Sequence, residues 1–499
     1  MKLKLLLAAC VLLASACTAR VGPLAVGGGN GGAGGGTSGM GGGTSGMGGG
    51  TSGTGGGTTT IAGFQPGPTG CQPQQLEADV SVGGYRSDRY AWSDSACLRR
   101  TAALVRNNAA DPGGSRGGFL RELTLELNGA PRTARGTGSN GWNGWGYVVN
   151  HYSNTADISR NKTGTFRTVL AGAHHAIHEF KVQMNPGGPL AVTITWFFAT
   201  GRSAPVFAVT FDSSGTAANT LNADSRTPYG DLAFEGTAGP IAGIAWGDLY
   251  RFTTTGSGPV TSASAWDYTQ PNLVPFVRMW SSAVDAEMGA VQTQTFEQHV
   301  GGGDYGGGLL VNACHGKTSA TKGANCSAAN ETMPQSWLWP FQLNQYELPF
   351  STSSHRLAWG TNYGAIGRTS VTAFGKTFSG YPTLRYGVFM VVGARSTNDT
   401  LAQVTQVERL TAAAVTGAAW NPLYATFDAT AATVTLDPKG AAIASPVFRF
   451  TAPQLTQVTL NGVPLTANAG YFATVDPATQ SVWVTLNGTV TGPISLQVQ

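Results

Sequence analysis

Short runs of β-branched and aromatic residues, separated by turn residues, most constrain the fold of this chain from residue 64 onward. Leucines alternate with polar residues over 122–127, and Asn128-Gly129 then supplies a two-residue hairpin turn. Leu190–Ala199 and Val206–Phe211 are separated by a short break that contains glycine and proline, so we expect two neighbouring buried strands. The pattern predicts a mostly β protein.

The pattern continues to the C-terminus, and helices are few. Further strands are expected at Leu384–Val392, Thr433–Leu436, Val447–Phe450, Gln457–Leu460 and Ser481–Leu486, with Asn461-Gly462 and Asn487-Gly488 closing the last two. A helix is expected over Leu401–Leu410, because apolar residues repeat every three positions after the capping sequence Asn398-Asp399-Thr400. Two further helices are expected at 96–105 and at 277–288.

The folded stretch, residues 64–499, exceeds one simple β-sandwich. We expect a large β-sandwich or supersandwich over 64–420 and a small C-terminal β-sandwich over 421–499. One very large double sheet is the alternative.

The segment before residue 64 is rich in glycine, threonine and serine. The unit GGGTSGM occurs at Gly34–Met40 and again at Gly41–Met47. Such side chains cannot build a core, so we expect residues 17–63 to form a disordered stalk. The repeat is interpreted as a tether and not as a solenoid.

The first 16 residues have the order of a signal peptide: Lys2 and Lys4, an apolar run over Leu5–Leu13, then small residues. The run is shorter than the about 20 residues that a membrane-spanning helix needs. Leu13-Ala14-Ser15-Ala16-Cys17 resembles the lipobox of bacterial lipoproteins, and Leu7-Ala8-Ala9-Cys10 is a rival match that leaves almost no apolar region. An ordinary secretory signal is the other alternative.

The lipoprotein resemblance implies cleavage before Cys17 and acylation of its thiol. Residue 18 is Thr and not Asp, which favours the outer membrane or the cell surface. We therefore expect an exported monomer that contacts the membrane only through its lipid anchor.

Four cysteines remain after the signal: Cys71, Cys97, Cys314 and Cys326. An even number in an oxidising compartment predicts two disulfides. Proximity favours Cys71 with Cys97 and Cys314 with Cys326, although three pairings are formally possible. A zinc site is the rival interpretation, but no CxxC spacing supports it.

Charged residues make up only 11% of the chain, and the net charge is +4. This balance excludes a strongly basic nucleic-acid footprint and an acidic tail. No nucleic acid is expected as a partner.

Several carboxylates stand beside aromatic residues in Tyr229-Gly230-Asp231, Trp246-Gly247-Asp248 and Trp266-Asp267-Tyr268. An aromatic ring covers the apolar face of a sugar while a carboxylate accepts hydrogen bonds from its hydroxyls. Two carboxylates roughly 5–10 Å apart also act as acid and base on a glycosidic bond. The candidates for such a pair are Asp231, Glu235, Asp248, Asp267, Asp285 and Glu287. The alternative is that the aromatics are core and the acids are turn residues.

Histidines form a second group of candidate site residues, at His174, His175 and His178. A strand through this segment would place His174 and His178 on one face and His175 and Glu179 on the other. A histidine on a sheet face acts as a general base near neutral pH. The alternative is a hydrogen-bonded structural histidine, and no metal site is predicted here.

Several tryptophans are candidate sugar-binding residues, because a sugar ring can stack against an indole ring. Trp142 and Trp145 lie in a Gly/Asn-rich stretch, and Trp337, Trp339 and Trp359 follow later. Core packing is the alternative, and it is favoured for the last three.

The segments 226–231 and 244–248, with the long strands before them, resemble the β-supersandwich domains of galactose-mutarotase-like proteins and of some polysaccharide lyases over residues 80–415. The resemblance implies a carbohydrate-active protein, and polysaccharide cleavage is the leading hypothesis. In a lyase, His174, His175 or Tyr229 would remove a proton, and Arg226 or Arg278 would neutralise the substrate carboxylate. Trp246 and Trp266 are further substrate-binding candidates.

The second hypothesis is a non-enzymatic glycan-binding or adhesion lipoprotein, and the third is a structural envelope protein. No cofactor is predicted, and a calcium ion is left open.

Overall fold

The chain divides into two units, Met1–Thr58 and Thr59–Gln499, and all elements described below lie in the second. The computed structural model describes residues 60–106, 117–127, 129–136, 144–152, 155–221, 224–234, 241–248, 251–259, 266–267, 272–274, 276–281, 284–293, 307–311, 314–315, 344–346, 355–361, 366–373 and 376–499.

A nine-stranded antiparallel sheet forms one layer of the fold. Its strands lie in the order β15 (Arg251–Pro259), β14 (Ile241–Asp248), β18 (Phe276–Ser281), β19 (Glu287–Gln292), β26 (Thr383–Gly393), β12 (Val206–Asp212), β11 (Leu190–Ala199), β10 (His175–Met184) and β9 (Gly164–Ala171). The two strands expected at 190–199 and 206–211 are confirmed as antiparallel neighbours.

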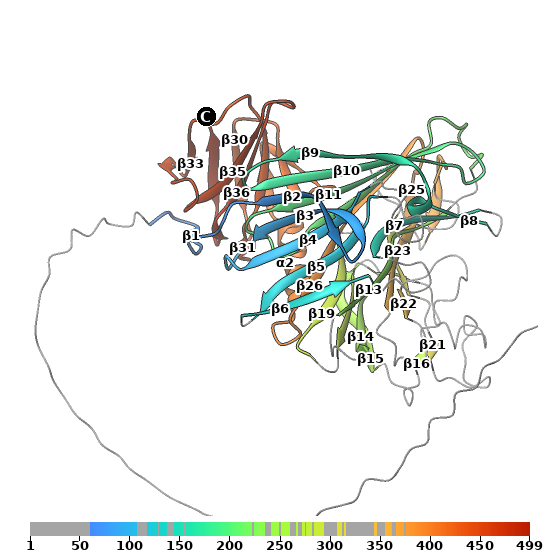
Figure 1. The fold of residues 1–499 in the computed structure, drawn as a ribbon. Helices are drawn as coiled ribbons and strands as arrows, with labels where there is room; N and C mark the ends of the chain where they lie inside the picture. The colour runs from blue at the N-terminus through green and yellow to red at the C-terminus, as the bar shows by residue number, and fades with distance from the viewer. Residues whose placement is uncertain are drawn as a thin grey trace, which may run out of the picture. The chain divides into compact units, whose positions relative to one another are not determined.

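A twelve-stranded antiparallel sheet forms the second layer. Its main order is β17 (Asn272–Val274), β20 (Gly307–Val311), β23 (His355–Thr361), β13 (Asp224–Phe234), β6 (Ala130–Arg135), β5 (Leu120–Leu127), β4 (Arg99–Val105), β3 (Tyr85–Ser93) and β2 (Gln75–Val82). Off this path lie β22 (Asn344–Tyr346), β7 (Trp145–Tyr152) and β8 (Thr155–Ile158). Figure 1 shows β2 to β6 in blue to cyan, side by side.

The main core lies between these two sheets, because alternate side chains of a strand point to opposite faces. Tyr90, Trp145, Trp196 and Tyr386 are among its members. The other face of the nine-stranded sheet is also covered: Phe197 and Phe389 pack against residues of the helix α2 (Asp399–Ala412) and of the C-terminal strands. Strand β26 is therefore buried on both faces, which explains its nearly continuous apolar sequence.

The C-terminal strands form small sheets around a core of their own. One five-stranded sheet has the order β27 (Ala414–Thr416), β30 (Thr433–Asp437), β38 (Ile494–Val498), β33 (Val458–Leu460) and β34 (Val463–Pro464). The other has the order β28 (Ala418–Asn421), β29 (Thr426–Ala429), β32 (Val447–Thr451), β36 (Ser481–Leu486) and β35 (Tyr471–Asp476). The mostly β fold class is thus confirmed, and the domain boundary near residue 420 stays a prediction.

The first described strand pairs with the C-terminal part of the chain. Strand β1 (Phe64–Pro66) and strand β31 (Ile443–Ala444) flank β37 (Gly488–Val490) in a three-stranded sheet, and Phe64 packs in the C-terminal core. A disulfide between Cys71 and Cys97 follows, which confirms that predicted pairing. The pairing of Cys314 with Cys326 lies outside the described residues.

Two-stranded sheets complete the described elements. They pair β16 (Trp266–Asp267) with β21 (Cys314–His315), and β24 (Val371–Ala373) with β25 (Lys376–Phe378). A 3-10 turn, η3 (Ser159–Asn161), lies after β8. Among the helices of the described ranges, none combines the length and the apolar character that crossing a membrane requires.

The helix predicted at 401–410 is confirmed as α2, whose N-cap is Asn398. The other two helix predictions were wrong. Residues 99–105 form strand β4, and the stretch from 277 to 288 contributes to strands β18 and β19. Apolar residues on both faces of these strands imitate a helical spacing, because burial on both sides removes the alternation that identifies a strand.

Candidate functional site

His174 and His175 lie where the β9–β10 turn meets the C-terminal strands. Both backbone N–H groups lie 3.1 Å from the Thr474 hydroxyl oxygen. The His174 Nε2 atom is 2.8 Å from the Asn468 side-chain oxygen, and the His175 Nε2 atom is 2.9 Å from the Thr485 hydroxyl. Burial lowers the pKa of both imidazoles, so the rings are held neutral.

The ring of His175 also packs near two aromatic rings, stacked with that of Phe197 and tilted to that of Trp483. Its centroid lies 6.2 Å from both the Phe197 and the Trp483 ring centroids, and the side chain is fully buried. This is the setting of a histidine that joins two parts of the fold. A catalytic role for either histidine stays a prediction.

Arg278 is engaged in a buried ion pair. Its guanidinium lies 2.6 Å from the Glu287 carboxylate and donates to the Asn398 side-chain oxygen at 3.1 Å. The other Glu287 oxygen accepts the Thr400 N–H at 2.7 Å, in the first turn of α2. Burial raises the pKa of the Glu287 carboxyl, and these contacts oppose the rise. Both residues therefore anchor α2 to strands β18 and β19.

The remaining predicted residues are distributed over several elements. Trp145 is buried in the main core, where its ring centroid lies 6.1 Å from Trp196 and 5.9 Å from Phe207. This packing leaves no open ring face for a sugar. Asp285 accepts hydrogen bonds from the N–H and the hydroxyl of Ser396, which lower the pKa of its carboxyl.

For the other residues only the backbone is placed. Arg226 and Asp231 lie on β13, Trp246 and Asp248 on β14, and Trp266 and Asp267 form β16. Strands β13 and β14 belong to different large sheets, so Asp231 and Asp248 are not strand neighbours. The predicted residues Cys17, Trp142, Glu235, Trp339 and Cys326 lie outside the described residues.

Tyr229 belongs to a cluster on the outer face of the twelve-stranded sheet, away from the main core. This outer-face tyrosine cluster comprises Tyr85, Val105, Phe119, Tyr147, Val149 and Tyr229. Tyr229 stands opposite Tyr147 in the β13–β7 register. The backbone is closely packed beside this pair: Gly230 stands opposite Trp145, and a Cβ on Gly230 would lie 2.0 Å from the Gly144 carbonyl oxygen.

Two guanidinium groups lie over rings of this cluster. Arg121 lies 4.7 Å from the Tyr85 ring centroid, and Arg160 lies 5.4 Å from the Tyr147 ring centroid. Such cation–π contacts hold positive charge beside aromatic faces. Tyr147 and Tyr229 are fully buried, so the cluster is closed to solvent.

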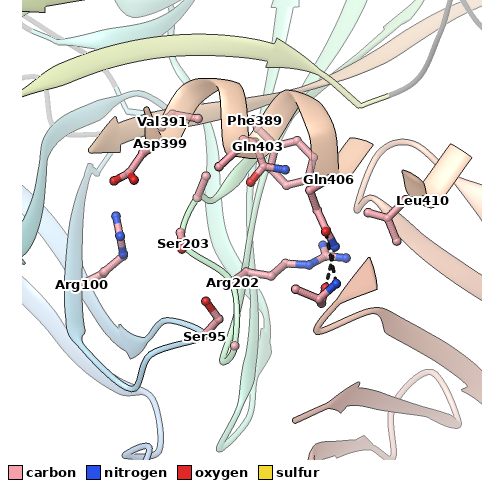
Figure 2. Close-up of a pocket in the computed structure, with 14 residues that line it drawn as sticks. Ser95, Arg100, Arg202, Ser203, Phe389, Val391, Asp399, Gln403, Gln406 and Leu410 are labelled. Atoms are coloured by element: carbon pink, nitrogen blue, oxygen red, sulfur yellow. Dashed lines mark hydrogen bonds between the residues drawn. The ribbon is translucent and has the colours of Figure 1, made fainter. Parts of the chain in front are cut away.

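A cavity of about 170 Å³ lies below α2, beside the turn that joins β11 and β12 (Figure 2). We call it the α2 pocket. Polar side chains reach it from four segments: Ser95, Arg100, Arg202, Ser203, Asp399, Gln403 and Gln406. Phe389, Val391 and Leu410 contribute apolar surface. It was not foreseen from sequence, because its polar residues lie in separate segments.

Gln406 and Arg100 are already engaged in this pocket. Gln406 exchanges two hydrogen bonds with the backbone of Ala444, which fixes α2 on β31. Arg100 pairs with the Asp94 carboxylate at 2.9 Å and donates to the Val392 carbonyl at 3.1 Å. By contrast, Ser95, Ser203 and Gln403 have no side-chain hydrogen-bond partner among the described residues.

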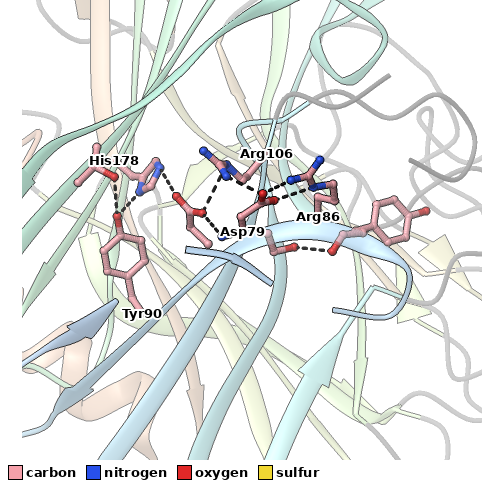
Figure 3. Close-up of polar contacts among 9 residues, drawn as sticks. Asp79, Arg86, Tyr90, Arg106 and His178 are labelled. Carbon is pink, nitrogen blue, oxygen red and sulfur yellow. Dashed lines mark hydrogen bonds and ion pairs between the residues drawn. The ribbon is translucent and has the colours of Figure 1, made fainter. Parts of the chain in front are cut away.

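A separate polar network crosses the main core between the two large sheets (Figure 3). The Tyr90 hydroxyl on β3 contacts Nδ1 of His178 on β10, and His178 Nε2 lies 3.5 Å from the Asp88 carboxylate. The network continues toward solvent through Arg106, Asp79 and Arg86. Burial lowers the pKa of His178 to about 3 and raises that of Tyr90. The phenol and the imidazole are both neutral, so this network joins the sheets.

Within the described residues, no group of three or more His, Cys, Asp or Glu side chains is arranged to hold a metal ion.

No protein-family model matches this chain, and no curated protein matches its sequence. Distantly similar solved structures include the GH36 α-galactosidase AgaA from Geobacillus stearothermophilus, with a TM-score of 0.34 and 11% identity, covering 65% of this chain and 43% of that chain. The galactose 1-epimerase from Lactobacillus acidophilus NCFM has a TM-score of 0.30 and 8% identity, covering 65% of this chain and 99% of that chain.

An α-mannosidase from Enterococcus faecalis V583 has a TM-score of 0.32 and 8% identity, covering 87% of this chain and 49% of that chain. The chain spans less than half the length of the α-galactosidase and of the α-mannosidase. At these TM-scores the similarity assigns no activity to the chain.

Proposed function

We propose that this chain is an exported carbohydrate-active lipoprotein that binds glycans through the α2 pocket. The observation that carries the proposal is the set of hydroxyl and amide groups of Ser95, Ser203 and Gln403, which line the pocket without partners among the described residues. Ser203 and Gln403 are half-buried, whereas Ser95 is exposed. Half-buried polar groups gain most from a ligand that supplies matching donors and acceptors. Sugar hydroxyls are both donors and acceptors, and the C–H groups of a sugar ring suit the apolar surface beside them.

Polysaccharide cleavage is the second candidate function, and the outer-face tyrosine cluster favours it. Tyr147 and Tyr229 stand opposite each other, with the Arg160 guanidinium over the Tyr147 ring. In a lyase step a deprotonated tyrosine would take the proton α to a uronate carboxylate, the C4–O bond would break as a C4=C5 bond forms, and the proton would pass to the departing oxygen. The guanidinium would offset the carboxylate charge. Because both rings are fully buried, this face would have to open first.

A panel of acidic and neutral polysaccharides distinguishes these functions for the full-length chain. Retention on an immobilised glycan is expected, and the double change Ser203→Ala with Gln403→Ala should weaken it by about tenfold, since two hydrogen bonds of about 0.5–1.5 kcal/mol each are lost. The matched control is Ser370→Ala with Gln454→Ala, two exposed residues outside the pocket, which should bind as the unchanged chain does.

Ultraviolet absorbance of unsaturated products and release of reducing ends are read in parallel. New absorbance that disappears in Tyr229→Phe would establish the lyase. Reducing ends without new absorbance would indicate a hydrolase and redirect attention to the carboxylates near residues 231–267. If nothing is retained and nothing is cleaved, the carbohydrate proposal is wrong.

We also infer that Cys17 carries the lipid and that the protein is exported to the outer membrane or the cell surface. The support is the signal-like segment over residues 1–16 and the cysteine after it. Metabolic labelling with a fatty acid should mark the wild-type chain in membranes and leave Cys17→Ala unlabelled in the soluble fraction. Cys10→Ala is the matched control and should remain labelled, and label that persists in Cys17→Ala would contradict this assignment.

A further inference from the structure

Arg202 places a positive charge in the α2 pocket. Its Nη1 donates to the Tyr424 carbonyl at 2.9 Å, and its Nη2 donates to the Ala425 carbonyl. Its guanidinium lies about 6 Å from the ring centroids of Phe197 and Phe389. A guanidinium has five N–H donors. Two of them donate to these carbonyls, and the other three have no acceptor among the described residues. Figure 2 shows this side chain crossing the pocket below α2.

No carboxylate balances the Arg202 charge within ion-pair distance in the described part of the chain. Asp94 pairs with Arg100 at 2.9 Å. Asp399 lies in the same pocket, but its two oxygens accept the Ala394 N–H at 2.9 Å and the Thr397 hydroxyl at 2.6 Å.

Burial without a counter-charge lowers the pKa of the Arg202 guanidinium to about 9. The group is nevertheless charged at neutral pH. A half-buried cation of this kind is stabilised most by an anion that reaches it with good geometry, and a carboxylate matches the planar fork of a guanidinium.

We propose that the α2 pocket binds a single carboxylate-bearing sugar unit, a uronic acid at the end of an acidic glycan, with the carboxylate paired to Arg202. The proposal rests on the proposed glycan-binding function for its sugar and adds the charge of the ligand. Ser95, Ser203 and Gln403 contact the sugar hydroxyls. The cavity of about 170 Å³ is smaller than the roughly 300–1,000 Å³ of sites for drug-sized ligands, which restricts the ligand to one small unit.

The first test compares matched sugars on the full-length chain by titration calorimetry. Galacturonate is measured against galactose, and glucuronate against glucose, with acetate as the simple anion. At least one uronate should bind tenfold or more tightly than its neutral parent and than acetate. Equal binding of neutral sugar and uronate would overturn the assignment of a carboxylate ligand. Binding of acetate as tightly as the uronate would overturn the assignment of a sugar ligand and leave a site for simple anions.

The second test changes the charge of the pocket. Gln403→Glu adds a carboxylate at a half-exposed position without existing partners, so the variant should fold. Because Gln403 also contacts the sugar, binding of the neutral parent should weaken too, but binding of the uronate should weaken at least tenfold more than that. Gln454→Glu makes the same charge change at an exposed position of the C-terminal part and should bind uronate unchanged. Arg202→Met should remove the preference for the uronate over the neutral sugar.

Arg202→Met also removes hydrogen bonds to two carbonyls, so this variant could fail to fold. In that case Gln403→Glu alone tests whether the pocket binds a carboxylate. A uronate preference that survives Gln403→Glu would overturn the proposal. The two proposals can be contradicted separately. Loss of polysaccharide retention with uronate binding intact would contradict only the proposed glycan-binding function. Retention of neutral glycans alone would contradict only the proposal that the ligand is acidic.

Discussion

Glu287→Ala should lower the free energy of unfolding by about 3–5 kcal/mol, the usual cost of leaving one partner of a buried ion pair uncompensated. The Glu287 side chain is fully buried, and its two oxygens hold Arg278 at 2.6 Å and the Thr400 N–H at 2.7 Å. The change would leave a buried guanidinium without its carboxylate and an N–H of the first turn of α2 without its acceptor. Both groups would then be desolvated without compensation.

Urea unfolding of the wild type, Glu287→Ala and Glu287→Gln measures this effect. The Gln variant retains an oxygen for Thr400 and loses only the charge, so its free energy of unfolding should lie between those of the wild type and Glu287→Ala. Glu408→Ala, at an exposed position of α2, is the control and should change the free energy by no more than about 0.5 kcal/mol. A loss below 1 kcal/mol in Glu287→Ala, accompanied by lost turnover, would instead support the carboxylate pair of a hydrolase.

Acidification should destabilise the protein steeply between pH 6.5 and 5.5. His174, His175 and His178 are all buried with lowered pKa values, and that of His178 is about 3. In the unfolded chain each ring titrates near 6.5. Below that pH the unfolded state binds protons that the folded state does not, so stability is fully present above about pH 6.5 and is lost as the pH falls.

Each histidine contributes up to about 1.4 kcal/mol per pH unit, so three give a limit of about 4 kcal/mol per unit. The raised pKa values of Asp88 and Glu287 act in the opposite direction, since their contribution is present at low pH and is lost as the pH rises. Urea unfolding at several pH values gives the net slope. His178→Gln should reduce that slope by about the contribution of one histidine. A free energy of unfolding that stays constant down to pH 5.5 would contradict the conclusion that these rings are buried and neutral.

The strands that were predicted correctly are those whose sequences carry a local signal. Leu190–Ala199 is rich in β-branched residues, and residues 122–127 alternate before a hairpin turn that pairs β5 with β6. The helix α2 was found from its capping sequence and its apolar spacing. Strands β18 and β19 were misread because their two faces are both buried, which leaves no alternation to detect.

The candidate site could be predicted much less well, because its contacts join residues that are far apart in the sequence. His174 contacts Thr474, 300 residues away, and Arg202 contacts Tyr424, 222 residues away. Arg202 itself lies in a turn, where an isolated arginine usually faces solvent. Only the folded chain shows that its charge is half-buried without an acidic partner, so composition and spacing gave no indication of the α2 pocket.

The pairing of β1 with β37 determines how the folded body would respond to a mechanical load applied through its N-terminal end. A pull on residue 60 reaches β1 first, and three residue pairs with β37 resist it. Once β1 detaches, the chain extends only as far as Cys71, because the disulfide to Cys97 transfers the load covalently to the loop before β4. The detached length is therefore limited to about ten residues. The large sheets would keep their register while that short segment yields and pairs again.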